Sequence, residues 1–573
     1  GYRRITVLKK SRKKTKPGLS PSMPTLSEDR TILSDIHELS AGDALKRVLD
    51  HPDPLHMVQS LPEGDFFWLI KKIGEDDCIP ILRLASEKQW QYLLDLELWD
   101  FDRLDLQQSF NWLRMLETAD AYRLADWLLT KEQDLLYLFL FNNISVEIGE
   151  EDDFIEPEDG VITIDGVFYI KVFEEERREV IERLLNILAS ENSAAYQTLL
   201  SGLVGVIHSE MEEEMFRMKN VRLAEHGFLG PEEAFEIYGR LTASSLKMEG
   251  NGETVHPLVA EDRSDLIPVS PLVHSVGGNL FPSVLSGIKD PRLMDSLWLE
   301  FAGLCNQIIS ADRIRVEVVD DLVNTSKRAA GYLNLTLENV CGSNREKALK
   351  LVENNSLQSL FRVGFSMTLE LKWMAQRWIK ASWFTKKGLE NRFWGEVLEG
   401  ILEGILEDKP KLHDSAGEEK FKFFERREEV LYVREKLHAL KGLDRLLSNL
   451  AEPYSLNPSD EIFFPETFQP IFLTIWARQM LELDTAFAPI TSKQSVELFR
   501  KLRAGESGPP YSMDPYKEPF VKDFMAAAPD LVAEEKEALE GYLALLWEDF
   551  SREYESFPDA PPDPRFSRFI LVK

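Results

Sequence analysis

Apolar residues recur at helical spacing through most of the chain, and short polar or proline-containing breaks separate the runs. One such i, i+3, i+4, i+7 series, the mark of a helix with one buried face, is Phe66, Leu69, Ile70 and Ile73. The same pattern predicts short helices over 44–49, 62–73, 77–84, 87–98, 104–116 and 122–129. The chain is therefore predicted to be mainly α and to begin with a stack of short helices.

Three candidate helix starts carry the capping-box pattern, a Ser or Thr followed three residues later by Glu or Gln. They are Ser60 with Glu63, Ser86 with Gln89, and Thr130 with Gln133. In a capping box the hydroxyl accepts a hydrogen bond from an amide of the first turn, and the longer side chain accepts one from the cap amide. The boxes are unevenly spaced, which indicates a short right-angled stack of helices rather than a regular solenoid.

Residues 161–172 depart from the helical pattern. They form two β-branched and aromatic runs around Asp165-Gly166, a pair that favours the positive φ angles of a type I′ turn. This segment predicts one small β-hairpin within the helical chain.

A long helix is predicted over 194–226, with Val204 and Met218 on its apolar stripe. Gly227 followed by the apolar Phe228 predicts that this helix ends in a Schellman-type turn.

Composition divides the chain into five regions. They are a disordered basic tail (1–39), the helical-repeat stack (40–145), an acidic loop with the β-hairpin and long helices (146–242), a Gly/Pro-rich connection (243–291) and a C-terminal helical domain (292–573). The predicted fold is thus mainly α, with stacked helical repeats, a second helical domain and one small β-hairpin element.

The net charge of −31, from 98 acidic and 67 basic residues, argues against nucleic acid or an anionic bilayer as a partner of the body of the chain. The basic arm at residues 1–16 is interpreted as a solubilising tail, although it could bind either weakly. No apolar run approaches the ~18 residues that a membrane span requires. The sequence therefore predicts no membrane span.

Three cysteines, Cys78, Cys305 and Cys341, show no short pairing, which indicates buried free thiols rather than a disulfide scaffold. The opening residues resemble no secretory leader. Together these features favour a cytoplasmic protein.

His208 and Glu212 are the weak candidates for metal ligands, because positions i and i+4 project from one face of a helix. The competing interpretation is a histidine at the edge of the core, hydrogen-bonded to Glu212. A divalent metal is therefore the one cofactor considered, and no cofactor-binding residue is assigned.

A Glu-x-x-His pair, as in carboxylate-bridged di-metal bundles, occurs at Glu435 and His438. Its second copy, Glu253 and His256, precedes Pro257, where a helix is not expected. The acidic loop after Glu147 is interpreted as a solvated loop, since it lacks the spacing of a calcium loop. The sequence shows no nucleophile elbow or phosphate loop, so no catalytic residue is assigned.

Five tryptophans punctuate the first helical region: Trp68, Trp90, Trp99, Trp112 and Trp127. Most are expected in the core, and any that lie on a concave surface would serve as anchors for a partner.

Residues 60–95 read Ser-Leu-Pro-Glu-Gly-Asp-Phe-Phe-Trp-Leu-Ile and then Asp-Asp-Cys-Ile-Pro-Ile-Leu-Arg-Leu-Ala-Ser. They resemble the Leu-Pro-x-x-Asp helical repeats in the cytosolic N-terminal domain of bacterial magnesium transporters and in flagellar motor switch proteins. The stretch from His208 to Phe228 is similar to a family of uncharacterised bacterial proteins, a domain of unknown function. That resemblance implies a bacterial cytoplasmic protein and supplies no catalytic residue.

Three hypotheses for function follow. The first is a cytoplasmic helical interaction or scaffold protein, not an enzyme, that binds another protein through the acidic surface of the helical-repeat stack. The second is a metal-dependent enzyme with His and carboxylate ligands from several helices. The third is a regulatory protein that responds to a divalent cation. The oligomeric state is not predicted.

Overall fold

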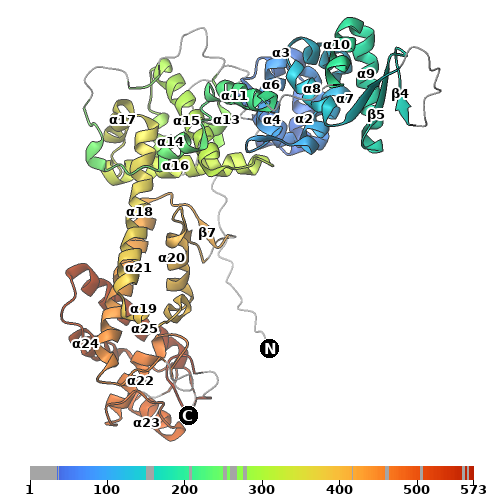
Figure 1. Ribbon diagram of the computed structural model, residues 1–573. Helices are drawn as coiled ribbons and strands as arrows, with labels where there is room; N and C mark the ends of the chain where they lie inside the picture. Colours follow the sequence, from blue (N-terminus) through green and yellow to red (C-terminus); the bar gives the residue numbers. More distant parts are fainter. Residues whose placement is uncertain are drawn as a thin grey trace. The chain divides into compact units, whose positions relative to one another are not determined.

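The computed structural model describes residues 35–36, 38–149, 160–204, 210–249, 255–257, 267–274, 280–415, 417, 419–458, 464–503, 508–557, 562–563 and 567–573. These residues are mainly helical, with small antiparallel sheets, as the apolar periodicity predicts (Figure 1). They form two compact units. Unit 1 draws on 35–239, 243–333 and 340–361, and unit 2 on 240–242, 334–339 and 362–573.

Unit 1 begins with the predicted stack of short helices. Its helices are α2 (Ala41–Leu49), α3 (Pro54–Gln59), α4 (Glu63–Ile73), η1 (Glu75–Asp77), α5 (Ile79–Leu84), α6 (Glu87–Glu97), α7 (Leu106–Thr130) and α8 (Gln133–Phe141). The apolar face of α4 is buried as predicted, with Phe66, Leu69 and Ile70 inaccessible to solvent. The two helices predicted over 104–116 and 122–129 form α7, whose backbone leaves helical geometry at Asp120.

One of the three capping boxes is confirmed. Ser86 accepts a hydrogen bond from the amide of Gln89, and the Gln89 side chain accepts one from the amide of Ser86. The other two boxes are wrong. Ser60 closes α3 by donating to the carbonyl of Met57, and Thr130 is the last residue of α7, where its hydroxyl donates to a carbonyl of the preceding turn. Each hydroxyl thus bonds the helix before it.

The predicted hairpin is present in a three-stranded antiparallel sheet of order β3-β5-β4, with β3 (Ile144–Ile148), β4 (Val161–Ile162) and β5 (Phe168–Val172). Gly166 has the predicted positive φ, +72°. The connection between β4 and β5 is longer than a two-residue turn, because the last paired residues before it are Ile162 and Ile170. The Asp165 carboxylate stabilises this connection by accepting hydrogen bonds from the amides of Val167 and Phe168. Strand β3 was not predicted. A two-residue hairpin, β1 (Trp99–Asp100) with β2 (Arg103–Leu104), lies between α6 and α7.

The rest of unit 1 is helical. Its elements are η2 (Glu175–Arg177), α9 (Arg178–Glu191), α10 (Ser193–Leu203), α11 (Glu210–Ala224), α12 (Pro231–Ala234), η3 (Phe235–Tyr238), η4 (Ala243–Ser245), α13 (Ser270–His274), α14 (Leu280–Leu285), α15 (Pro291–Asp312), α16 (Val319–Cys341) and α17 (Arg345–Asn354). The boundary between the units falls within α16 and within α18 (Leu357–Ala381).

The single long helix predicted over 194–226 is wrong, because α10 ends at Leu203 and α11 begins at Glu210. The predicted apolar stripe is buried only in part, since Leu200 and Leu203 are buried whereas Val204 and Met218 are exposed. The predicted Schellman end is confirmed. The amide of Phe228 donates to the carbonyl of Leu223 across Gly227, whose φ is +85°.

Unit 2 is also mainly helical. After α18 come α19 (Trp383–Lys386), η6 (Asn391–Trp394), α20 (Glu396–Leu406), β6 (Leu412–His413), β7 (Phe421–Lys422), α21 (Arg427–Ala451), α22 (Gln469–Met480), α23 (Ser492–Leu502), η7 (Asp514–Tyr516), α24 (Lys517–Ala526) and α25 (Ala533–Tyr554). Helix α25 packs along α21 and α24, and its core contacts are aromatic: Trp547 lies edge-on to Trp476, with ring centroids 4.9 Å apart.

Residues 243–291, predicted to connect two helical halves, are assigned to unit 1. The finer division into five regions remains a prediction. No helix among the described residues is long and apolar enough to cross a membrane.

A buried carboxylate ties this Gly/Pro-rich region to the helical stack. Asp65 of α4 is inaccessible to solvent, and its oxygens accept the amides of Val269 at 3.0 and 3.1 Å and of Ser270 at 2.9 Å. These amides lie at the start of α13, where a helix has donors without intrahelical partners. A hydrogen bond to an ionised carboxylate is stronger than one between neutral groups, so it contributes more to the stability of this attachment.

We expect Asp65→Asn to weaken this attachment. Loss of the charge should raise the hydrogen-exchange rates of the Val269 and Ser270 amides by about tenfold or more, corresponding to roughly 1.5–3 kcal/mol for bonds to a charged acceptor. The matched control is Asp53→Asn, since Asp53 is an exposed carboxylate that accepts the amide of His56, and asparagine serves equally well at a helix start. Unchanged exchange in the Asp65 variant would contradict the assignment.

Candidate binding cleft in unit 1

A cleft of about 270 Å³ lies within unit 1. Its walls come from α4, α6, the β1–β2 hairpin, α11, residues 228–231, the C-terminal half of α15 and residues 313–316. Several aromatic side chains contribute to the lining, among them Trp68, Tyr92, Trp99, Phe101 and Phe216. We call this feature the Lys219 cleft, after the one lysine that lines it.

Lys219 is held between two aromatic rings. Its Nζ lies 5.1 Å from the centroid of the Trp99 ring and 4.6 Å from that of Phe216, and the two ring centroids are 5.5 Å apart. The residue is 9% exposed, and no described residue forms a hydrogen bond or ion pair with its ammonium group. Burial lowers the pKa of Lys219 to about 8, against the opposing influence of Asp95.

A second cation, Arg313 at the end of α15, contacts an aromatic ring of the β1–β2 hairpin. The guanidinium of Arg313 is 5.4 Å from the ring of Phe101, which is 63% exposed. Four described non-glycine residues have positive φ, and Phe101 (+57°) and Arg313 (+52°) are two of them. Such conformations cost about 1–3 kcal/mol each and often mark functional sites.

Two carboxylates of the cleft wall, Asp95 and Glu97, are already paired with other cations. Asp95 accepts two hydrogen bonds from Arg222, at 2.7 and 2.6 Å, and Glu97 lies 2.8 Å from Nζ of Lys71. Burial raises the pKa of Glu97, and Lys71 opposes that rise. Neither carboxylate is therefore free to serve as the counter-ion of Lys219.

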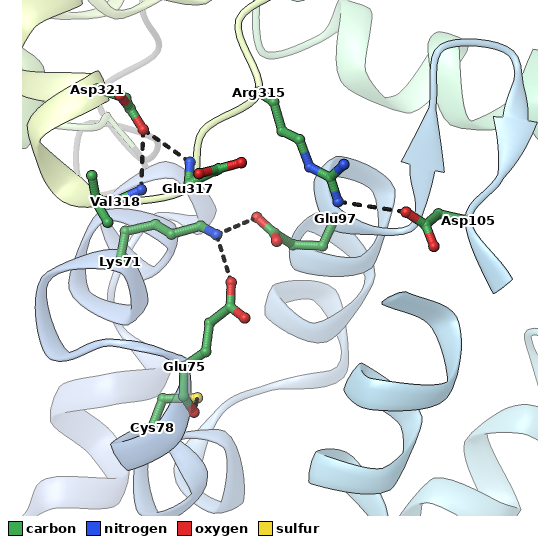
Figure 2. A network of polar contacts seen from close by, with 9 residues as sticks. All are labelled: Lys71, Glu75, Cys78, Glu97, Asp105, Arg315, Glu317, Val318 and Asp321. Carbon is green, nitrogen blue, oxygen red and sulfur yellow. Dashed lines mark hydrogen bonds and ion pairs between the residues drawn. The ribbon is translucent and has the colours of Figure 1, made fainter. Parts of the chain in front are cut away.

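Figure 2 shows the polar network beside this wall. Lys71 reaches both Glu97 and Glu75, the latter at 3.1 Å, and Arg315 reaches Asp105 across 3.5 Å. In the same view Asp321 accepts the amides of residues 317 and 318, which fixes the turn that leads into α16. The network orders the backbone on both sides of the cleft.

The predicted metal candidates meet different environments. His208 lies outside the described residues. One carboxylate oxygen of Glu212 accepts the amide of Leu104 at 2.8 Å, so Glu212 attaches α11 to the β1–β2 hairpin. A metal role for this pair stays a prediction. Among the described residues, no three His, Cys, Asp or Glu side chains gather closely enough to hold a metal ion.

The structure describes three of the four residues in the two Glu-x-x-His pairs. The exposed Glu435 pairs with Lys436, and the Nδ1 atom of His438 has no hydrogen-bond partner among the described residues. Burial lowers the pKa of His438. His256 is buried, with Nδ1 2.7 Å from a carboxylate oxygen of Glu300 and Nε2 2.8 Å from the carbonyl oxygen of Val352. Its partner in the motif, residue 253, lies outside the described residues.

The prediction that most of the five tryptophans lie in the core is confirmed, and the role of an exposed one as a partner anchor stays a prediction. Trp68, Trp90, Trp112 and Trp127 are buried, whereas Trp99 is only partly buried and faces the cleft. The three cysteines are buried and free, and burial raises the pKa of each thiol. Buried thiols with raised pKa values are poor nucleophiles.

Lys219 was not singled out from the sequence. It lies three residues after Phe216 and four before Leu223, which places it on the face of α11 that those two residues share. A lysine in the middle of an apolar helical face is the signal that could have found it.

A family model matches residues 21–573, nearly the whole chain. The chain belongs to DUF6178, a family of unknown function. No curated protein matches the chain, and neither does any solved structure. Family membership thus confirms the resemblance to a domain of unknown function, and the comparisons give no support to the resemblance of residues 60–95 to magnesium transporters or flagellar switch proteins.

The environment of His256 generates a prediction of pH dependence. Hydrogen bonding to Glu300 and Val352 outweighs burial and raises the pKa of His256 above 6.5. Since the folded-state pKa exceeds the unfolded one, the contribution of the imidazolium to stability is complete below about pH 6.5 and is lost as the pH rises through the folded-state pKa. His256→Gln should therefore lower the melting temperature more at pH 6 than at pH 9.

Thermal unfolding of the wild type and the variant at both pH values tests this expectation. The control is His56→Gln, because His56 is exposed on α3, and it should change neither melting temperature. An equal or larger loss at pH 9 than at pH 6 would show that His256 is not stabilised as the charged form.

Proposed function

We propose that the protein is a helical interaction protein that binds a partner protein through the Lys219 cleft of unit 1. The observation that supports this most directly is the pairing of Trp99 with Lys219 and of Phe101 with Arg313 on one short hairpin. Tryptophan and arginine contribute most of the binding energy at protein interfaces, particularly where a central pocket excludes water.

The rim of the cleft supports a macromolecular partner. Phe101, which lines the cleft, is 63% exposed, so its side chain is accessible to a partner. An exposed aromatic beside a partly buried tryptophan offers a partner one accessible contact and one deeper contact. This arrangement differs from the predicted acidic interaction surface. The cleft lies partly within the stack, and its lining combines aromatic rings with three carboxylates and three cations.

The two metal-based hypotheses draw no comparable support from the part of the chain that the structure describes, since no ligand cluster forms there. The proposed function therefore rests on the Lys219 cleft alone.

Photo-crosslinking from the cleft tests the proposal. With p-benzoyl-phenylalanine in place of Phe101, a lysate of cells that naturally make the protein should yield a discrete crosslinked species on a denaturing gel. Adding Trp99→Ala should reduce its yield by about tenfold or more, as expected for loss of a central aromatic anchor. Mass spectrometry then identifies the partner.

Tyr122 supplies the control position, because its side chain is also 63% exposed but it lies on α7 and does not line the cleft. The same substitution there should give no such species. Equal crosslinking from both positions, or a yield from position 101 that Trp99→Ala leaves unchanged, would refute binding through the cleft.

A further inference from the structure

We infer that the Lys219 cleft receives the C-terminal residue of the partner, with its free carboxylate on the ammonium of Lys219 and an apolar side chain against the aromatic walls. This inference rests on the proposed function and specifies which part of the partner enters.

The charge of Lys219 lacks a counter-ion in the described structure. An ammonium nine-tenths removed from water is costly unless it is paired, and the faces of Trp99 and Phe216 compensate only in part. A buried polar group without a partner that lines an open cleft points to a ligand of complementary charge.

Three carboxylates line the cleft, and none of them forms a hydrogen bond or ion pair with Lys219: Asp95, Glu97 and Asp100. Both oxygens of Asp95 are occupied by Arg222, and Glu97 is occupied by Lys71. Arg313, at the mouth, has the Phe101 ring as its contact and no carboxylate partner among the described residues. Lys219 and Arg313 therefore line the cleft without an ion-pair partner among the described residues, in a chain whose net charge is −31. An entering carboxylate would supply that partner.

The size of the cleft favours a chain end over a passing segment. A volume of about 270 Å³ is just below the usual range of about 300–1,000 Å³ for ligand sites. A C-terminal residue carries its side chain and its carboxylate on the same Cα. One residue can therefore pack its side chain against the aromatic walls and place its carboxylate beside Lys219. An internal acidic residue would require the backbone to enter the cleft and leave it again.

A carboxylate fits better than a polyanion. The cations that line the cleft are few and lie among rings, whereas a nucleic acid or a phosphate-rich surface is bound by extended basic patches. The acidic body of the protein would repel such ligands along their length.

Three short peptides test the inference by isothermal titration calorimetry on the full chain. They are acetyl-Ala-Ala-Phe as the free acid, the same peptide as the C-terminal amide, and acetyl-Ala-Glu-Phe as the amide. The free acid should bind at least tenfold more tightly than either amide, because only the acid places a terminal carboxylate beside Lys219.

The variant Lys219→Met should abolish this preference, so that acid and amide bind equally. The matched control is Lys436→Met on α21, since Lys436 also lies over an aromatic ring, that of Tyr432 at 5.3 Å, but is in unit 2. The control should keep the full preference. Lys219→Met removes an unpaired buried charge, so the melting temperature of this variant should be no lower than that of the wild type. A normal melting temperature excludes unfolding as the reason for the lost preference.

Several outcomes would overturn the inference. They are equal binding of acid and amide to the wild type, a preference that survives in Lys219→Met, tighter binding of the peptide with the internal glutamate, and no binding of the free acid at about 10 mM. If crosslinking from position 101 depends on Trp99 while any of these holds, the proposed function stands and the terminal-carboxylate inference fails. Failure of that crosslinking would instead refute the proposed function itself.

Discussion

The position of α11 against the helical stack depends on the ion pair between Asp95 and Arg222. Both carboxylate oxygens accept a guanidinium N–H, and the carboxylate side chain is almost fully buried. This geometry fixes the rotation of α11 about its axis, because the helix must present Arg222 to α6. Residue 219, three positions earlier, is then turned toward Trp99. The environment of Lys219 follows from where its neighbour on the helix is held.

The same ion pair also decides the electrostatics of the cleft. Asp95 pairs with Arg222 rather than with Lys219. The planar guanidinium group of Arg222 can donate two parallel hydrogen bonds to one carboxylate, which an ammonium group cannot do. Lys219 feels Asp95 only at longer range, which moderates the fall of its pKa without neutralising the charge. Lys219 thereby remains a buried ammonium without an ion-pair partner among the described residues.

The sequence predicted the kind of elements better than their ends or their partners. Helical periodicity identified α4 and α6, whose buried faces are set by local spacing, and Asp165-Gly166 identified the turn of a hairpin. The capping pattern held at Ser86 but failed at Ser60 and Thr130, since a hydroxyl at a helix junction can bond the helix on either side. Strand β3 was missed because it gains its stability from pairing with β5, whose residues lie 20 to 28 positions further along the chain.

The candidate site was predicted less well than the fold. Trp99 is less buried than the other four tryptophans because of how α11 and the residues after α15 pack against the hairpin. No local sequence pattern indicates that packing. The prediction of one continuous helix over 194–226 placed His208 on its apolar stripe and left Lys219 off it. Once α11 stands alone, the apolar face that contains Lys219 differs from the predicted stripe.

Helix α11 is also sparsely anchored. Of its fifteen residues, all of which the structure describes, Lys219 and Leu223 alone are buried. The Arg222 ion pair and the bond from Leu104 to Glu212 supply the other specific attachments to the stack and hairpin. A helix held by so few contacts opens at a lower free energy than the core around it. Any occupant of the cleft adds contacts to this helix, so occupancy and local folding of α11 form a single coupled equilibrium.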